Sequence, residues 1–231
     1  MRSGPVLEYM AAEDVNGFEG KRKRLVETLQ DDGIVRTPVV RKAMLTVPRE
    51  HFVLPEHRAS AYADTPLAIP ADATISAPHM HAMYLEAAKL KPGQSVLEIG
   101  FGSGILLAYT KELVGSKGKV VGVEISPDVY IFGKRALERA GYDKKVKLVL
   151  GDISSKSIDG KFDRIFVSAT APEVPKPLLD MLKPEGMLIA PVGDAYGDQQ
   201  LVLVLKTKGR LLMKSLGSVA FVPLRGEHGI K

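Results

Sequence analysis

The most constraining stretch of this 231-residue chain is Ser95–Gly104, which reads SVLEIGFGSG. Its first five residues form a short apolar run, long enough for one buried β-strand. Three glycines follow at alternate positions, and a helical apolar pattern begins at Ile105. Because glycine has no Cβ, such a loop lets backbone N–H groups approach a ligand closely. The stretch predicts a strand, a ligand-binding glycine loop and a helix; a plain strand-to-helix turn is the alternative interpretation.

Acidic residues stand at the ends of three successive predicted strands. Glu98 lies near the end of the first strand, Glu124 ends the next apolar run, and Asp152 follows the third. Because the carboxyl ends of parallel strands meet at one edge of a sheet, these acids outline a nucleoside pocket. A carboxylate at Glu124 could accept hydrogen bonds from both ribose hydroxyls. The dinucleotide pattern G-x-G-x-x-G would need glycine where the chain has Ile105, so an NAD site is not favoured.

Strand and helix patterns alternate through the rest of the chain. We therefore expect an α/β fold with a doubly wound, mostly parallel, Rossmann-like sheet. N-terminal helices should precede the sheet, and a C-terminal antiparallel hairpin should complete it. The later apolar runs that we interpret as strands are 162–167, 187–192, 201–205, 210–215 and 219–224.

The residues before the sheet divide into an arm and a helical segment. Residues 1–20 have poor periodicity and should form an N-terminal arm, whose apolar side chains could pack against a neighbouring subunit of a homo-oligomer. Residues 21–90 should open with a helix, continue with a second helix from Pro38, and include a proline-rich irregular stretch at 53–78. Residues 91–231 then form the sheet domain with the cofactor pocket.

Composition excludes several classes of site. The chain has no cysteine, which excludes disulfides, thiolate zinc sites and a cysteine nucleophile. His79 and His81 do not have the spacing of a zinc-binding helix motif, so we expect no metal. No apolar run approaches 18 residues and no signal peptide is evident, so we expect a cytoplasmic protein without a membrane partner. The net charge of +5 permits nucleic-acid binding without requiring it.

Several stretches resemble a known family. The G-x-G-x-G loop, with an acid two residues before it, resembles motif I of the class I S-adenosylmethionine methyltransferases, and this resemblance implies a sheet of seven strands. The chain as a whole, from about Arg22 to Leu224, resembles the protein-L-isoaspartate (D-aspartate) O-methyltransferases. The most specific stretch is Thr74–His81, which reads TISAPHMH. The other matching stretches are 47–53, 61–67 and 221–224.

The resemblance implies a reaction and its partners. Members of this family transfer a methyl group from S-adenosylmethionine to the α-carboxyl of L-isoaspartyl residues in damaged proteins or peptides, and the sequence leaves open whether D-aspartyl residues are also substrates. The cofactor product is S-adenosylhomocysteine. The ester then closes to a succinimide, and hydrolysis returns some normal aspartyl residues, so the family repairs proteins. No stable nucleic-acid partner is implied.

The resemblance also implies the site residues. Ser76 would be the active-site hydroxyl. The cofactor would be bound by Thr74, His81, Glu98, Gly100, Gly102, Ser103, Gly104, Glu124, Ile125, Asp152 and Ile153. The substrate would contact Ile69, Ile75, Val167, Ala169, Val222, Pro223 and Leu224.

The chain departs from the family in one loop. The family usually has glycine where this chain has Pro70, and glycine or glutamine near Asp72. Proline fixes φ where glycine is free, so the path of this loop is open. Asp72 adds a negative charge near a site that must receive a carboxylate.

Other interpretations stay open at this point. Ser76 could instead cap the helix that follows Pro78, a role that serine fills well. The chain could be a nucleic-acid base methyltransferase, although enzymes that methylate base amino groups typically have Asn/Asp-Pro-Pro-Tyr where this chain has SATAP at 168–172. It could also bind the cofactor without catalysing transfer.

Overall fold

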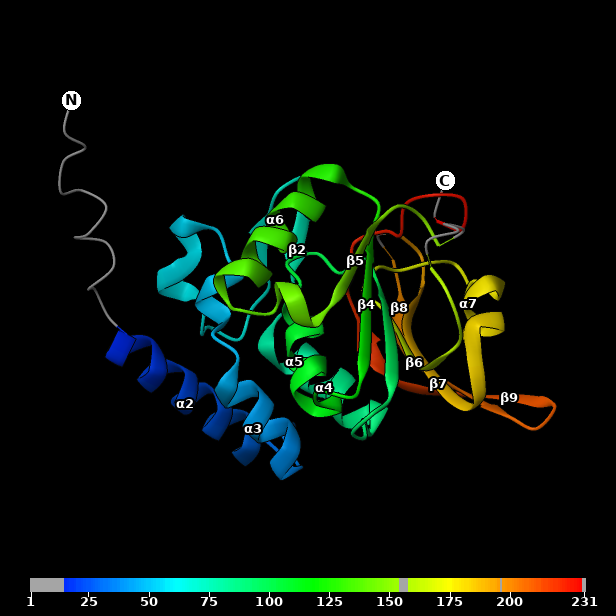
Figure 1. Cartoon of the computed structure of the whole chain (residues 1–231), viewed down its shortest axis with the longest axis horizontal. Helices are drawn as coiled ribbons and strands as arrows, with labels where there is room; N and C mark the ends of the chain where they lie inside the picture. The colour runs from blue at the N-terminus through cyan, green and yellow to red at the C-terminus, as the bar shows by residue number, and fades with distance from the viewer. Residues whose placement is uncertain (1–14, 154–157, 196, 230–231) are drawn as a thin grey trace.

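The computed structural model of the chain describes residues 15–153, 158–195 and 197–229. These residues form a seven-stranded sheet with the strand order β5-β4-β3-β6-β7-β8-β9 (Figure 1). β3 to β7 run parallel, and β8 and β9 extend the sheet as antiparallel strands. The predicted α/β fold with a C-terminal hairpin is confirmed. The strands are β3 (Ser95–Ile99), β4 (Lys119–Glu124), β5 (Lys147–Leu150), β6 (Phe162–Val167), β7 (Leu182–Gly193), β8 (Gln199–Thr207) and β9 (Arg210–Val219).

Helices cover both faces of the sheet, and each face has its own apolar core (Figure 1). Val96 and Val120 share one core with the N-terminal helices and with α4, α5 and α6. Leu97 and Val121 point to the other face, which α7 covers. This alternation follows from the pleat, since successive strand side chains point to opposite faces. The helices are α2 (Val15–Asp31), α3 (Pro38–Thr46), α4 (Pro78–Ala88), α5 (Ile105–Val114), α6 (Pro127–Arg139) and α7 (Lys176–Met181).

The stretch 53–78, which the sequence predicts to be irregular, contains a short β-hairpin. Its strands pair antiparallel, and its turn places Ala71 and Asp72 in the left-handed region, with φ of 60° and 57°. Turns of this kind usually have Asn-Gly at their centre, because the left-handed region disfavours a Cβ. The missing glycines explain why the sequence gives no hairpin signal here. The short elements are η1 (Arg49–His51), η2 (Pro55–Ser60), β1 (Leu67–Ile69), β2 (Ala73–Ile75) and, before β5, η3 (Asp143–Lys145).

The first helix begins earlier than the sequence predicts. α2 starts at Val15 rather than at Lys21. Two glycines weaken the helical pattern of these residues. In the fold, however, the ring of Phe18 lies 6.4 Å from that of Tyr62, so tertiary packing stabilises the first turns. Residues 1–14 lie outside the described residues, and with them most of the arm through which the sequence predicts a homo-oligomer.

The strand predicted for 219–224 is wrong, because β9 already ends at its first residue. The chain then runs beside Thr170. The N–H of Thr170 donates to the carbonyl of Val222 (2.8 Å), and the N–H of Leu224 donates to the carbonyl of Thr170 (2.7 Å). Pro223 has no N–H to continue a ladder, so the pairing is limited to an isolated bridge.

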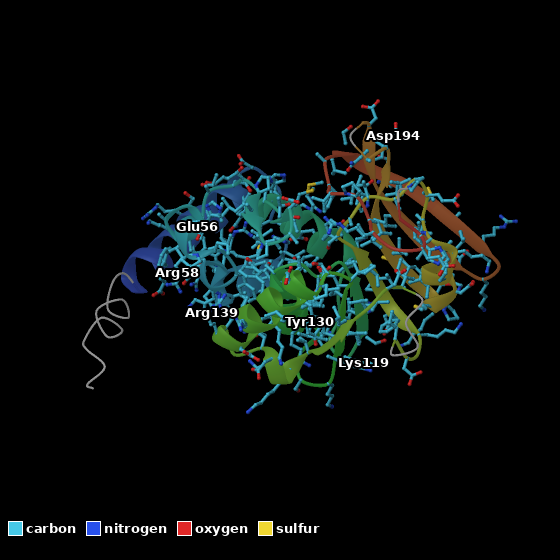
Figure 2. The ribbon with its side chains drawn as sticks, turned by 90° about the horizontal axis from the view of Figure 1, so that it is seen from above. Glu56, Arg58, Lys119, Tyr130, Arg139 and Asp194 are labelled. Carbon is cyan, nitrogen blue, oxygen red and sulfur yellow. The ribbon has the colours of Figure 1, made fainter. Side chains whose placement is uncertain are left out.

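An arginine of α6 contacts the N-terminal segment, and a second arginine makes a bond within that segment. Nη2 of Arg139, at the end of α6, donates to the carbonyl of His51 (2.7 Å). Nε of Arg58, in η2, donates to the carbonyl of Glu50 (3.4 Å). Figure 2 shows Arg58 and Arg139 on the same side of the molecule. The division between the N-terminal segment and the sheet domain stays a prediction.

α6 packs directly against the glycine loop between β3 and α5. A Cβ placed on Gly133 of α6 would lie 2.3 Å from the carbonyl oxygen of Gly102 and 2.7 Å from the ring of Phe101. Both distances are shorter than a van der Waals contact, and the first involves backbone that cannot rotate away. Glycine at this helix position therefore allows the helix and the loop to approach closely.

Gly133→Ala should lower the free energy of unfolding by about 1–3 kcal/mol, because overpacking forces the loop or the helix to shift. Gly20→Ala in α2 is a matched control, since the nearest atom to its new Cβ is the flexible Nη1 of Arg24 at 3.6 Å. The control should gain about 0.5–1 kcal/mol, because alanine favours helix more than glycine does. Denaturant unfolding of both variants measures the difference, and a gain in stability for Gly133→Ala would contradict the packing argument.

Candidate active site

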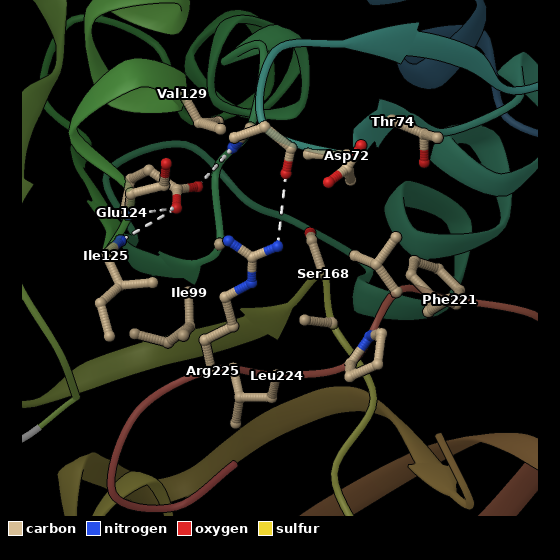
Figure 3. A pocket seen from close by; sticks show the side chains of 18 of the residues that line it. Asp72, Thr74, Ile99, Glu124, Ile125, Val129, Ser168, Phe221, Leu224 and Arg225 are labelled. Atoms are coloured by element: carbon tan, nitrogen blue, oxygen red, sulfur yellow. Dashed lines mark hydrogen bonds between the residues drawn. The ribbon is translucent and has the colours of Figure 1, made fainter. Parts of the chain in front are cut away.

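A cavity of about 980 Å³ lies at the carboxyl ends of β3, β4 and β6 (Figure 3). β3 has β4 on one side and β6 on the other, so the chain changes direction across the sheet at this point. Such switch points are where open α/β sheets bind their ligands. The volume is at the upper end of the range for small-molecule sites. The geometry therefore provides room for a nucleoside-sized ligand together with part of a second reactant.

Glu124 connects the glycine loop to the start of α6. Its carboxylate accepts hydrogen bonds from three backbone N–H groups: Gly102 on Oε2 (3.2 Å), and Ile125 (2.9 Å) and Ser126 (3.0 Å) on Oε1. A carboxylate has about four acceptor positions. One position, on Oε2, is therefore left for a donor from the cavity, which Glu124 lines.

Glu98 is buried behind the cavity wall, with an exposed fraction of 2%. Its Oε1 accepts a hydrogen bond from the hydroxyl of Ser168 (3.0 Å), and Ser168 lines the cavity. Its Oε2 has no hydrogen-bond partner among the described residues. Burial raises the pKa of Glu98, the Ser168 hydroxyl lowers it, and the charge of Glu124 raises it again. A buried carboxylate with an unused oxygen fits a cationic donor that arrives with a ligand.

The segment after β9 forms part of the cavity wall, where its residues 220–225 line it. Oδ1 of Asp152 accepts from the N–H of Ile153 (2.5 Å), and Oδ2 accepts from the N–H of Glu227 (2.9 Å). On the other side, Nη2 of Arg225 donates to the carbonyl of Ala71 in the hairpin turn (3.3 Å; Figure 3). These contacts join the end of β5, the C-terminal segment and the β1–β2 hairpin around one opening.

The cavity gathers many of the residues that the sequence assigns to the site. Those that line it are Thr74, Gly100, Gly102, Glu124, Ile125, Asp152, Ile153, Ala169, Val222, Pro223 and Leu224. The remaining residues do not line it: Ile69, Ile75, Ser76, His81, Glu98, Ser103, Gly104 and Val167. The functional roles of both groups stay predictions.

His81 is one of the residues that do not line the cavity. It is buried in α4, where its ring lies 5.9 Å from that of Tyr109. Burial lowers its pKa, and the nearby charges of Arg49 and His79 lower it further, so its imidazole is neutral near pH 7. His79 instead pairs with Asp64, with 3.0 Å between Nδ1 and Oδ1.

Ser76 lies in the connection between β2 and α4. The residue that caps α4 is Ala77, which makes no side-chain capping bond, so the interpretation of Ser76 as a helix cap is wrong. Its carbonyl accepts a hydrogen bond from Nη2 of Arg49 (2.9 Å). Thr74, two residues earlier, lines the cavity.

Ser168 and Arg225 line the cavity but are not among the site residues that the sequence named individually. Ser168 is recognisable only by its hydrogen bond to Glu98, and Arg225 only by its reach across the cavity to the hairpin. Both contacts join residues far apart in the chain, so no local pattern predicts them. Asp72 also lines the cavity, and Figure 3 shows its side chain and that of Arg225 within it.

Comparison with known proteins identifies the family. The sequence model described as protein-L-isoaspartate(D-aspartate) O-methyltransferase matches residues 20–229. The chain belongs to this family. A protein-L-isoaspartate O-methyltransferase from Thermococcus onnurineus is 50% identical over 209 residues, which covers 89% of this chain and 94% of the relative. One from Hyperthermus butylicus is 46% identical over 226 residues, covering 94% and 93%.

Solved structures agree with the sequence comparison. A Plasmodium falciparum protein, assigned to the same family and crystallised with S-adenosyl-L-homocysteine, aligns with a TM-score of 0.78 at 31% identity. The alignment covers 87% of this chain and 96% of that one. A second protein-L-isoaspartate O-methyltransferase aligns with a TM-score of 0.80 at 31% identity, covering 90% of this chain and 67% of that one.

This methyltransferase therefore uses S-adenosylmethionine and acts on isoaspartyl residues in the repair of damaged proteins. The family excludes the alternative of a nucleic-acid base methyltransferase. Within the described residues, no helix is long and apolar enough to cross a bilayer.

The residues present at the cavity fit this cofactor. The glycine loop has no Cβ to fill the space beside the cavity, and Gly100 and Gly102 have the left-handed φ values, 72° and 55°, that the loop requires. The carboxylate of Glu124 has one acceptor position that no described residue occupies, which suits a hydroxyl donor.

Glu124→Gln should weaken S-adenosylmethionine binding by at least about 1.5 kcal/mol, the usual value of a hydrogen bond to a charged group. The amide has a single acceptor oxygen, so its NH₂ group must face a backbone N–H that the carboxylate now satisfies. Isothermal titration calorimetry measures the affinity.

Glu86→Gln is the matched control for this prediction. Glu86 is also a buried carboxylate that accepts from backbone N–H groups, those of Arg36 and Thr37 (both 2.8 Å), but it does not line the cavity. The control should lose stability and keep its cofactor affinity. Equal affinity losses in the two variants would show that Glu124 acts only through the fold.

Proposed function

We propose that Ser76 orients the α-carboxylate of an isoaspartyl residue for methyl transfer, in a site whose cofactor is held by the glycine loop, Glu124 and Asp152. The supporting observation is the arrangement of the cavity, which is lined both by the hairpin that leads to Ser76 and by these cofactor residues. S-adenosylmethionine supplies the methyl group from its sulfonium. The protein then has to align the two reactants and keep water out.

The reaction needs little acid–base help from the protein. A carboxylate with a pKa near 4 is already ionised at neutral pH, so no base has to remove a proton before attack. When the protein holds the carboxylate oxygen in line with the methyl group, a bimolecular step becomes effectively unimolecular, which lowers its entropic cost. A hydroxyl that donates to one carboxylate oxygen and leaves the other free to attack meets this requirement.

Ser76 is suited to this role by its place in the chain. Within the part of the chain that the structure describes, its hydroxyl makes no intramolecular hydrogen bond that would compete with a ligand. Its main chain is held by the buried Arg49. A free hydroxyl on a fixed backbone can donate to a substrate without first breaking another contact.

Part of the cavity wall is apolar. Ala169, Val222 and Leu224 line it, and the bridge between Thr170 and the C-terminal segment fixes their backbone. An apolar wall strengthens the polar contacts that remain, because it lowers the local dielectric constant. We propose that it contacts the peptide on either side of the isoaspartyl residue. Peptides with D-aspartyl residues form a second substrate class, to be compared in the same assay.

We also propose that the enzyme works in the cytoplasm. S-adenosylmethionine is charged and does not diffuse through a bilayer, so the enzyme must share a compartment with its supply. Cell fractionation tests this assignment.

Ser76→Ala should lower the rate of methyl transfer by about 10²-fold, the scale expected when reacting groups are misplaced. Ser76→Thr keeps the hydroxyl and should keep partial activity. Both variants should retain their affinity for S-adenosylhomocysteine, since the cofactor residues are untouched. Single-turnover methylation of an isoaspartyl peptide, beside its aspartyl twin, measures the rates.

Ser218→Ala, which removes an exposed hydroxyl on β9, is the control and should behave as the unmodified enzyme. Full activity in Ser76→Ala would remove Ser76 from the mechanism. A methyl or acyl group trapped on Ser76 would replace direct transfer with a covalent route. Methylation of the aspartyl twin at the same rate would contradict the proposed substrate.

A further inference from the structure

One stretch that resembles the family has no residue in the cavity: Val47–Val53, which contains η1. Its central feature is Arg49, whose exposed fraction is 1%. It is among the largest fully buried side chains in the described residues. Burying a guanidinium is costly, so its surroundings should reveal what the charge does there.

Arg49 joins the three family-like stretches of the N-terminal segment. It belongs to the first stretch, and its Nε donates to the carbonyl of Ala61, the first residue of the second (2.8 Å). Its Nη2 donates to the carbonyl of Ser76 in the third (2.9 Å). Because a guanidinium is planar and its donors are fixed, these two bonds set the position of Ser76 relative to η1.

The charge of Arg49 has no ion-pair partner among the described residues. Two carboxylates of this segment pair with other groups: Glu50 with Arg22 at 3.0 Å, and Asp64 with His79 at 3.0 Å. Nη1 of Arg49 is buried and makes no hydrogen bond within the described residues. Buried charges are normally paired, so an unpaired one that holds the main chain of Ser76 is a candidate for function.

Arg49 remains a cation at neutral pH. Burial lowers its pKa to about 10, and the nearby Tyr109, Tyr62 and Asp64 oppose that shift. A pKa of about 10 lies well above 7, so the protonated form dominates. The substrate group is an anion, and a cation within the protein interior interacts with it more strongly than it would in water.

We infer that Arg49 is a positioning residue of the methyl-transfer site, which fixes the main chain at Ser76 and whose unpaired buried charge favours binding of the substrate carboxylate. The inference rests on the proposed role of Ser76. Arg49 does not line the cavity, so it acts through the Ser76 connection and through its electrostatic field.

A second buried arginine provides the matched control. Arg164 in β6 has an exposed fraction of 6%, and its guanidinium also donates to two carbonyls, those of Ala88 (2.6 Å) and Asp163 (2.7 Å). It does not line the cavity and has no bond to the Ser76 connection. Replacing it tests what any buried arginine contributes to the fold.

The experiment compares Arg49→Lys, Arg49→Met, Arg164→Lys and Arg164→Met at a temperature where circular dichroism shows all of them folded. Arg49→Met should lower kcat/KM for an isoaspartyl peptide at least 30-fold, with S-adenosylhomocysteine affinity within twofold of the unmodified enzyme. Arg49→Lys keeps the charge and loses the fixed pair of donors, so KM should return toward normal while kcat stays low. The Arg164 variants should lose stability only.

A binding measurement separates the charge from catalysis. Fluorescence anisotropy with S-adenosylhomocysteine-loaded enzyme compares an isoaspartyl peptide with its α-carboxamide analogue, which has the same shape and no charge. The unmodified enzyme should prefer the carboxylate, and Arg49→Met should bind the two peptides equally. The same comparison in Ser76→Ala should still show the preference, so this readout does not depend on Ser76.

Each failure has a distinct signature. A carboxylate preference that survives in Arg49→Met, or equal losses of kcat/KM in the Arg49 and Arg164 variants, overturns the inference. If Arg49→Met does not fold, Arg49→Lys with an unchanged kcat overturns it instead. Additive effects of Arg49→Lys and Ser76→Ala in the double variant overturn the link between the two residues. Full activity of Ser76→Ala alone overturns only the proposed role of Ser76.

Discussion

The carboxylate of Glu124 is the contact on which the rest of the site depends. Three backbone N–H groups converge on it, one from the glycine loop and two from the turn into α6. It therefore connects the ends of two neighbouring strands, β3 and β4, with the helix that packs over the loop. Gly133 in that helix lets the loop and helix approach to backbone contact. The carboxylate of Glu124 and the absence of a Cβ at Gly133 thus shape the glycine loop without any ligand.

The parts of the fold that depend on local sequence could be predicted from it. The apolar run, the glycines and the acids at 95–104 specify strand, loop and helix within ten neighbouring residues, and parallel topology brings Glu124 and Asp152 to the same edge. The extra turns of α2 were beyond prediction, since glycines weaken the pattern and a contact with Tyr62 stabilises the helix. The β1–β2 hairpin gave no signal, because its left-handed turn contains Ala71 and Asp72 instead of glycine.

The candidate site also has residues that could be predicted from the sequence and contacts that could not. Several residues that the resemblance implies do line the cavity, because they come from short stretches that are recognisable in the sequence. It could not show that Arg225 reaches the hairpin, that Ser168 bonds to Glu98, or that Arg49 holds the carbonyl of Ser76. Those contacts join residues separated by 154, 70 and 27 positions. They follow from the packing of the whole chain.

The position of the C-terminal segment in the chain affects the order in which the parts of the protein can fold. Residues 220–227 supply one wall of the cavity and the N–H that bonds to Asp152, and they follow every strand of the sheet in the chain. During synthesis, the sheet and its helices can pair while this wall does not yet exist. Cofactor binding at full strength therefore cannot assist early folding. The nascent sheet has to be stable without its ligand, and its two apolar cores are what provide that stability.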